Sequence, residues 1–134
     1  MTDPSLEPVG DLSFASEILH SYHPRDEQQR AFQGQLLGWI EAHPSDAHRR
    51  ECLAGHLTGS ALLLDANRER LLLHHHRKLG LWLQFGGHCD GDANLRGVAW
   101  RETVEESGIV PAWMSEDPID LDVHAIPALS LIHI

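Results

Sequence analysis

Gly86-Gly87-His88-Cys89-Asp90-Gly91-Asp92 forms a glycine-rich run, and the helical pattern after it ends in Arg101-Glu102-Thr103-Val104-Glu105-Glu106-Ser107-Gly108. The pattern predicts a helix from about 94 to 107, which Gly108 ends. At about 100° per residue, Leu95, Val98 and Ala99 share one face of this helix. Glu102 and Glu106 continue that face, and Glu105 flanks it. The sequence therefore predicts three carboxylates along one side of the helix end.

Three carboxylates are unusual at the C-terminal end of a helix. The helix dipole favours cations there, and like charges four residues apart repel each other. A divalent cation bound among the carboxylates would relieve both penalties, and hard oxygen ligands suit Mg²⁺ or Mn²⁺. The preceding glycines let the backbone approach a ligand closely. A solvated acidic helix end remains the alternative, but the glycine-rich run favours a site where a metal bridges the protein to phosphate.

At these residues the chain resembles the Nudix hydrolase family. The Nudix box is a glycine, five residues, a glutamate, seven residues, and then Arg-Glu-U-x-Glu-Glu-x-Gly-U, where U is a bulky aliphatic residue. The matching positions are Gly87, Arg101, Glu102, Glu105, Glu106, Gly108 and Ile109. Ala93 stands in place of the first glutamate, and Thr103 stands at the first aliphatic position. The resemblance extends over roughly residues 55–127.

The resemblance implies an α/β fold, a Nudix-type α/β/α sandwich with a mixed sheet. It also implies an Mg²⁺-dependent enzyme, with Mn²⁺ as the alternative metal. Such an enzyme uses metal-activated water to cleave the diphosphate linkage of a nucleoside diphosphate joined to another group. Two alternatives on the same fold are a non-catalytic domain that senses a nucleotide and an isomerase that acts on an isoprenoid diphosphate.

The resemblance also implies roles for individual residues. Glu102 and Glu106 would be metal ligands, and Glu105 would be a further ligand or would help to activate water. Gly87 would let a loop carbonyl approach the metal, and Arg101 would orient the carboxylates. The expected catalytic residues are thus Glu105, Glu106 and Arg101, and the expected metal site is Glu102, Glu105, Glu106 and Gly87. Family members often support the arginine with the first glutamate of the box, so here we expect Asp90 or Asp92 to take that place.

Composition limits the classes of partner. The chain has 134 residues, enough for one domain, and a formal net charge of −10. This charge argues against binding to a nucleic-acid polymer or an anionic membrane, because both need a cationic surface. Cys52 and Cys89 are too few for a disulfide scaffold. We therefore expect a cytoplasmic protein with a small-molecule, nucleoside-diphosphate-type substrate; the sequence leaves the oligomeric state open.

The rest of the chain divides into segments of different character. Residues 1–54 are expected to be an N-terminal extension, weakly structured to about residue 23, with one helix at about 26–43. Residues 55–128 are expected to form the Nudix domain. Within it we predict a hairpin from strands 57–64 and 71–76, an extended piece at 80–84, a break at 85–87, and a half-buried strand at 119–126. Rings along His74-His75-His76 would alternate between faces, so we do not expect them to share a metal.

We expect the C-terminal residues 129–134 not to belong to the natural protein. Leu129-Ser130-Leu131-Ile132-His133-Ile134 is what CTG-TCT-CTT-ATA-CAC-ATC encodes, and that string looks like the mosaic end of a transposase used to prepare sequencing libraries. The hypothesis is that the reading frame ran into adapter after Ala128. On this hypothesis the Nudix domain is incomplete at its C-terminus.

Overall fold

A computed structural model describes residues 3–125 of the chain, and residues 1–2 and 126–134 lie outside this range. The predicted adapter-derived tail, 129–134, is therefore outside the described residues. The elements in chain order are the 3₁₀ helix η1 (Pro4–Leu6), the helices α1 (Ser13–Ser21) and α2 (Glu27–Ala42), the strands β1 (Thr58–Ala61), β2 (Leu63–Leu64), β3 (Leu71–Leu72), β4 (His74–His76), β5 (Leu81–Leu83) and β6 (Phe85–His88), and the helix α3 (Leu95–Ser107).

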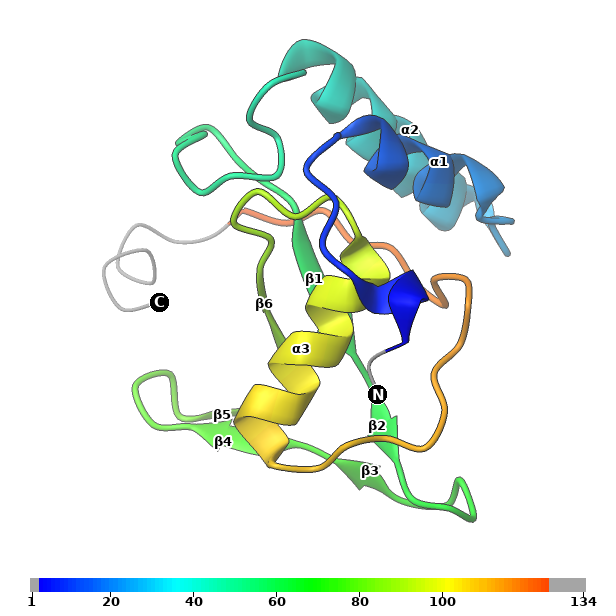
Figure 1. The fold of residues 1–134 in the computed structure, drawn as a ribbon, viewed down its shortest axis with the longest axis vertical. Helices are drawn as coiled ribbons and strands as arrows, with labels where there is room; N and C mark the ends of the chain where they lie inside the picture. Colours follow the sequence, from blue (N-terminus) through cyan, green and yellow to red (C-terminus); the bar gives the residue numbers. More distant parts are fainter. Residues whose placement is uncertain (1–2, 126–134) are drawn as a thin grey trace.

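The strands pair as three short antiparallel ladders, β1 with β6, β2 with β3, and β4 with β5. Helix α3 crosses in front of β1 and β6, while α1 and α2 lie together at one end of the molecule (Figure 1). The molecule is thus a small fold of mixed helices and strands, which agrees with the α/β class expected from the sequence. The predicted hairpin of strands 57–64 and 71–76 is present only where β2 pairs with β3. The rest of the first strand, β1, pairs with β6, and the rest of the second, β4, pairs with β5.

Helix α3 lies directly on strand β1. A Cβ at Gly59 would come within 3.0 Å of the Val98 side chain and 2.9 Å of the Leu95 carbonyl oxygen, so only glycine permits this approach. The helix begins where the Asn94 side chain accepts a hydrogen bond from Gly97 N, and it ends at Gly108, whose φ is 73°. The predicted helix at about 94–107 is therefore confirmed.

The predicted break at 85–87 is wrong, because these residues belong to strand β6. Gly87 pairs with Gly59 across the ladder, and Gly86 pairs with Ser60. Two adjacent glycines suggested a turn, but here they make room on both faces of the strand. A Cβ at Gly86 would collide with the Ser60 side chain, and one at Gly87 would collide with Glu102.

The prediction that residues 1–23 are weakly structured is also wrong, because α1 covers Ser13–Ser21. The helix start does carry a local signal, since the Asp11 side chain accepts from Ser13 N at 2.9 Å. Packing stabilises the helix further, with Ala15 and Leu19 buried in the core. Helix α2 also has a local signal, since the Asp26 side chain accepts from Gln29 N, and the predicted helix at about 26–43 is confirmed.

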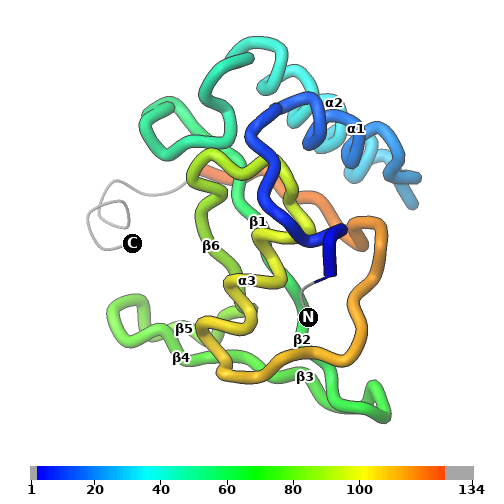
Figure 2. The backbone as a smooth tube through the Cα atoms, viewed as in Figure 1, coloured from blue at the N-terminus to red at the C-terminus, as the bar shows by residue number. Residues whose placement is uncertain are grey.

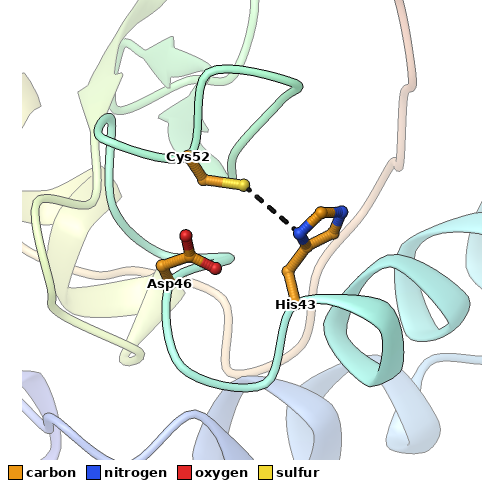
Figure 3. A group of neighbouring side chains, drawn as sticks. All are labelled: His43, Asp46 and Cys52. Carbon is orange, nitrogen blue, oxygen red and sulfur yellow. Dashed lines mark hydrogen bonds between the residues drawn. The ribbon is translucent and has the colours of Figure 1, made fainter.

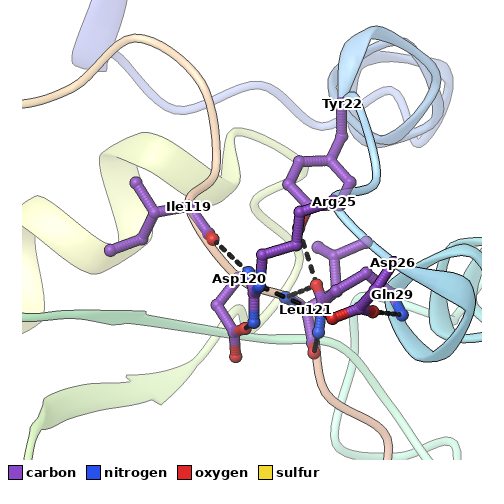
Figure 4. A network of polar contacts seen from close by, with 7 residues as sticks. All are labelled: Tyr22, Arg25, Asp26, Gln29, Ile119, Asp120 and Leu121. Atoms are coloured by element: carbon purple, nitrogen blue, oxygen red, sulfur yellow. Dashed lines mark hydrogen bonds and ion pairs between the residues drawn. The ribbon is translucent and has the colours of Figure 1, made fainter.

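The segment predicted as a strand at 119–126 forms no strand over its described residues, which end at 125. The buried Gln29 side chain of α2 makes the two hydrogen bonds to the Leu121 main chain that a neighbouring strand would make. Gln29 accepts from Leu121 N at 2.8 Å and donates to Leu121 O at 2.9 Å, and Tyr22 donates to the same amide oxygen at 2.7 Å (Figure 4). Arg25 adds an ion pair to Asp120. This docking buries Leu121, whereas Ile119 and Val123 are exposed, so the alternation of apolar residues does not mark a buried face.

Residues 5–9 of the N-terminal segment are hydrogen-bonded to the start of α3, and Figure 2 shows the two segments close together. Ala93 N donates to Val9 O at 2.6 Å, and the Asn94 amide donates to the Ser5 and Glu7 carbonyl oxygens. The extension predicted for residues 1–54 thus positions the loop that leads into α3. Within residues 3–125, no helix has the length and apolar character needed to span a membrane.

Candidate functional site

Strand β6 and helix α3 bring together three of the predicted site residues. Gly86 N donates to the Glu106 carboxylate at 3.0 Å. A Cβ at Gly87 would lie 2.5 Å from the Glu102 carboxyl carbon, so the Glu102 side chain occupies the space beside the Gly87 backbone. Glu105 lies on the same last turns of α3 and is exposed. The missing Cβ of Gly87 therefore leaves room for the Glu102 carboxylate, and Glu106 reaches the main chain of β6 through Gly86 N.

The surroundings of Glu102 disfavour the ionised form of its carboxyl group. Burial raises the pKa of Glu102, and the neighbouring charges of Glu105 and Glu106 raise that pKa further. Arg101 acts in the opposite direction and does not offset these causes. A carboxylate in such a field gains from a nearby cation, which would favour its ionised form.

The three glutamates do not converge tightly on one point. Among residues 3–125, the only three His, Cys, Asp or Glu side chains whose ligand atoms lie within 4.8 Å of one another are His43, Asp46 and Cys52. The glutamates nevertheless fit a hard divalent cation in the kind of donor they offer, together with the cradle that the absent Cβ of Gly87 leaves.

Arg101 takes its partner from the loop before the helix. Of the two acids that the sequence offers, Asp92 accepts from Arg101 Nη1 at 3.2 Å. Asp90 instead binds Arg50 through two hydrogen bonds, at 2.8 and 2.7 Å, which lower the pKa of Asp90. Asp92 is only 6% exposed, so its position is fixed by the fold.

The departure at Ala93 has a structural reason. Ala93 is fully buried, and its N–H donates to Val9 O at 2.6 Å. A position this buried leaves a longer, charged side chain no exposed surface through which to reach solvent. The residue one position earlier, Asp92, therefore supplies the carboxylate for Arg101.

Sequence reasoning missed one neighbour of the site, His74. Its Nε2 lies 3.4 Å from the Glu106 carboxylate, and its ring stacks on buried Phe85 with centroids 5.1 Å apart. The signal was present in the period of two along β4. His74 and His76 share one face, while His75 points to the other and packs against Trp82. The neighbouring rings thus alternate as predicted.

Comparison with known proteins gives no match: no protein-family model matches the chain, and no curated protein matches it.

Proposed function

We propose that this chain is a Nudix-type diphosphohydrolase that cleaves a nucleoside diphosphate linked to another group. The proposal includes a Nudix-type α/β/α sandwich with a mixed sheet, of which the described elements would be part. It also places the protein in the cytoplasm, in keeping with two cysteines that are both free.

The observation that carries the proposal is the meeting of β6 with the acidic face of α3. The Gly87 backbone lies against the Glu102 carboxylate, and Gly86 N binds Glu106. The box therefore does more than match in spacing, because its first glycine and two of its glutamates are neighbours in space. A merely solvated helix end would not need glycine at a contact with a strand.

Mg²⁺ or Mn²⁺ held by Glu102, Glu105, Glu106 and the Gly87 carbonyl would offset the charge of a diphosphate and make water a better nucleophile. The protein's part is to hold these oxygens in place. Arg101 extends beside the carboxylates and is itself held by Asp92. Glu105, which is exposed, would accept a proton from water.

The test is turnover by the full 134-residue chain with an isoprenoid diphosphate and a panel of nucleoside diphosphates linked to a sugar, a second nucleoside or a phosphate. We expect two phosphate-containing products in the presence of Mg²⁺ and none after chelation. Ligand binding without product would favour the nucleotide-sensing alternative. A rearranged isoprenoid diphosphate with no cleavage would favour the isomerase. Either outcome would overturn the proposal.

Gly87→Ala separates the role of this glycine in the site from its role in folding. The three heavy atoms nearest the new Cβ all belong to the end of the flexible Glu102 side chain, so we expect the carboxylate to turn away while the backbone stays. We expect activity to fall by roughly tenfold, on the scale of a small misplacement of reacting groups, with little change in the melting temperature. The measurement is kcat/KM beside a thermal melt; unchanged kcat/KM would remove Gly87 from the site.

A further inference from the structure

A second cluster of metal-binding side chains lies in the segment between α2 and β1, away from the glutamates. His43, Asp46 and Cys52 place their ligand atoms within 4.8 Å of one another. The Cys52 sulfur and the His43 Nδ1 are 3.5 Å apart, and the Asp46 carboxylate points into the same space (Figure 3). One nitrogen, one oxygen and one sulfur donor thus meet within ten consecutive residues.

The segment that carries these residues is held in place by contacts within the protein, without a bound ion. The Trp39 ring packs on the His43 ring with centroids 4.3 Å apart, and its Nε1 donates to Gly55 O at 3.0 Å. Leu57 N donates to the carbonyl oxygen of fully buried Ala47 at 2.7 Å. Hydrogen bonds therefore fix the loop at both ends, and its donor atoms need little reorganisation to bind a metal ion.

The chemistry of the three donors selects the kind of metal. Imidazole and thiolate suit borderline and soft ions, whereas Mg²⁺ and Ca²⁺ prefer oxygen. With Zn–N of about 2.05 Å and Zn–S of about 2.3 Å, two ligands of a tetrahedral zinc are about 3.6 Å apart. The observed distance between Cys52 Sγ and His43 Nδ1, 3.5 Å, fits that edge.

We propose that His43, Asp46 and Cys52 bind one Zn²⁺ ion through Nδ1, a carboxylate oxygen and Sγ. The thiol proton is released to solvent on binding, and water fills the fourth position of the tetrahedron. The site is independent of the proposed hydrolase activity, since it uses other residues and another class of metal.

The ion would fasten a segment that also contacts the loop before α3. Arg50, between two of the ligands in sequence, binds Asp90 through both carboxylate oxygens. Zinc bound only by the folded chain would raise the melting temperature.

The test uses Co²⁺ as a spectroscopic probe on the full chain, with excess Mg²⁺ present to occupy oxygen-only sites. We expect a thiolate-to-cobalt charge-transfer band in the near ultraviolet that Zn²⁺ abolishes at one equivalent. Cys52→Ser should remove the band, whereas Cys89→Ala, which removes the other cysteine of the chain, should keep it. Circular dichroism checks that each variant is folded.

Asp46→Asn gives a second, milder test that does not touch the buried thiol. We expect it to weaken Zn²⁺ binding at least tenfold in competition with a chromogenic chelator, because even outer partners of a metal contribute this much. Asp117→Asn, at an exposed acid, is the matched control and should bind as the wild type does. Cobalt binding without a thiolate band, or a band that survives in Cys52→Ser, would show that His43 and Cys52 form only a hydrogen bond and would overturn the proposal.

Discussion

Glu106→Gln is expected to lower turnover about 100-fold or more, the scale of losing one charge that stabilises a transition state. The substitution isolates charge from shape. Glutamine keeps a side-chain oxygen that accepts from Gly86 N, so the contact between α3 and β6 is retained. It removes a negative charge from the C-terminal end of a helix and from beside Glu102, whose pKa the Glu106 charge raises. Stability should therefore stay the same or rise slightly.

The measurement is kcat and KM with saturating Mg²⁺, together with a thermal melt of each protein. Glu17→Gln is the matched control, because it makes the same chemical change at an exposed position of α1. We expect the control to match the wild type in both measurements. Full activity of Glu106→Gln would show that this carboxylate is not a ligand, whereas a lowered melting temperature would show that its role is structural.

The elements that the sequence predicted well are those with local signals at their ends. Asp26 and Asn94 each cap a helix through their own side chains, and Gly108 takes the left-handed conformation that ends α3. These contacts lie within a few residues, so they can be read along the chain. Strand β6 has no such signal, because close contacts with Ser60 and Glu102 specify it. Helix α1 has only one short contact of this kind, from Ser13 N to the Asp11 side chain, and it also packs on α2.

The candidate site shows the same division. The helical period predicted that Glu102 and Glu106 share a face, and the structure places both against β6. The sequence could not decide between Asp90 and Asp92 as the partner of Arg101. That choice depends on residues far away in the chain, because Arg50 takes Asp90 and Val9 helps to fix Asp92.

Asp92 therefore joins three parts of the molecule, and its removal should have the largest effect on stability. One carboxylate oxygen accepts from Val9 N at 3.0 Å and from Asn94 N at 2.9 Å, and the other accepts from Arg101 at 3.2 Å. The side chain is nearly buried, so water cannot easily replace it. Asp92→Ala would leave two main-chain N–H groups without an acceptor, at about 1–3 kcal/mol each. We expect a loss of about 3 kcal/mol in the free energy of unfolding, and a fall of roughly 10 °C in melting temperature.

Asp92→Asn is the matched variant that separates folding from the site. Its amide oxygen can still accept from Val9 N and Asn94 N, so most of the stability should remain. Its NH₂ group would face the Arg101 guanidinium, which needs an acceptor there. Arg101 would therefore lose its hydrogen bond to residue 92, and we expect activity to fall even though the chain is folded. Chemical denaturation with both variants and the wild type measures the difference. If Asp92→Ala unfolds at the same denaturant concentration as the wild type, the N-terminal segment is not held through Asp92. If Asp92→Asn keeps full activity, Arg101 does not need a carboxylate partner at this position.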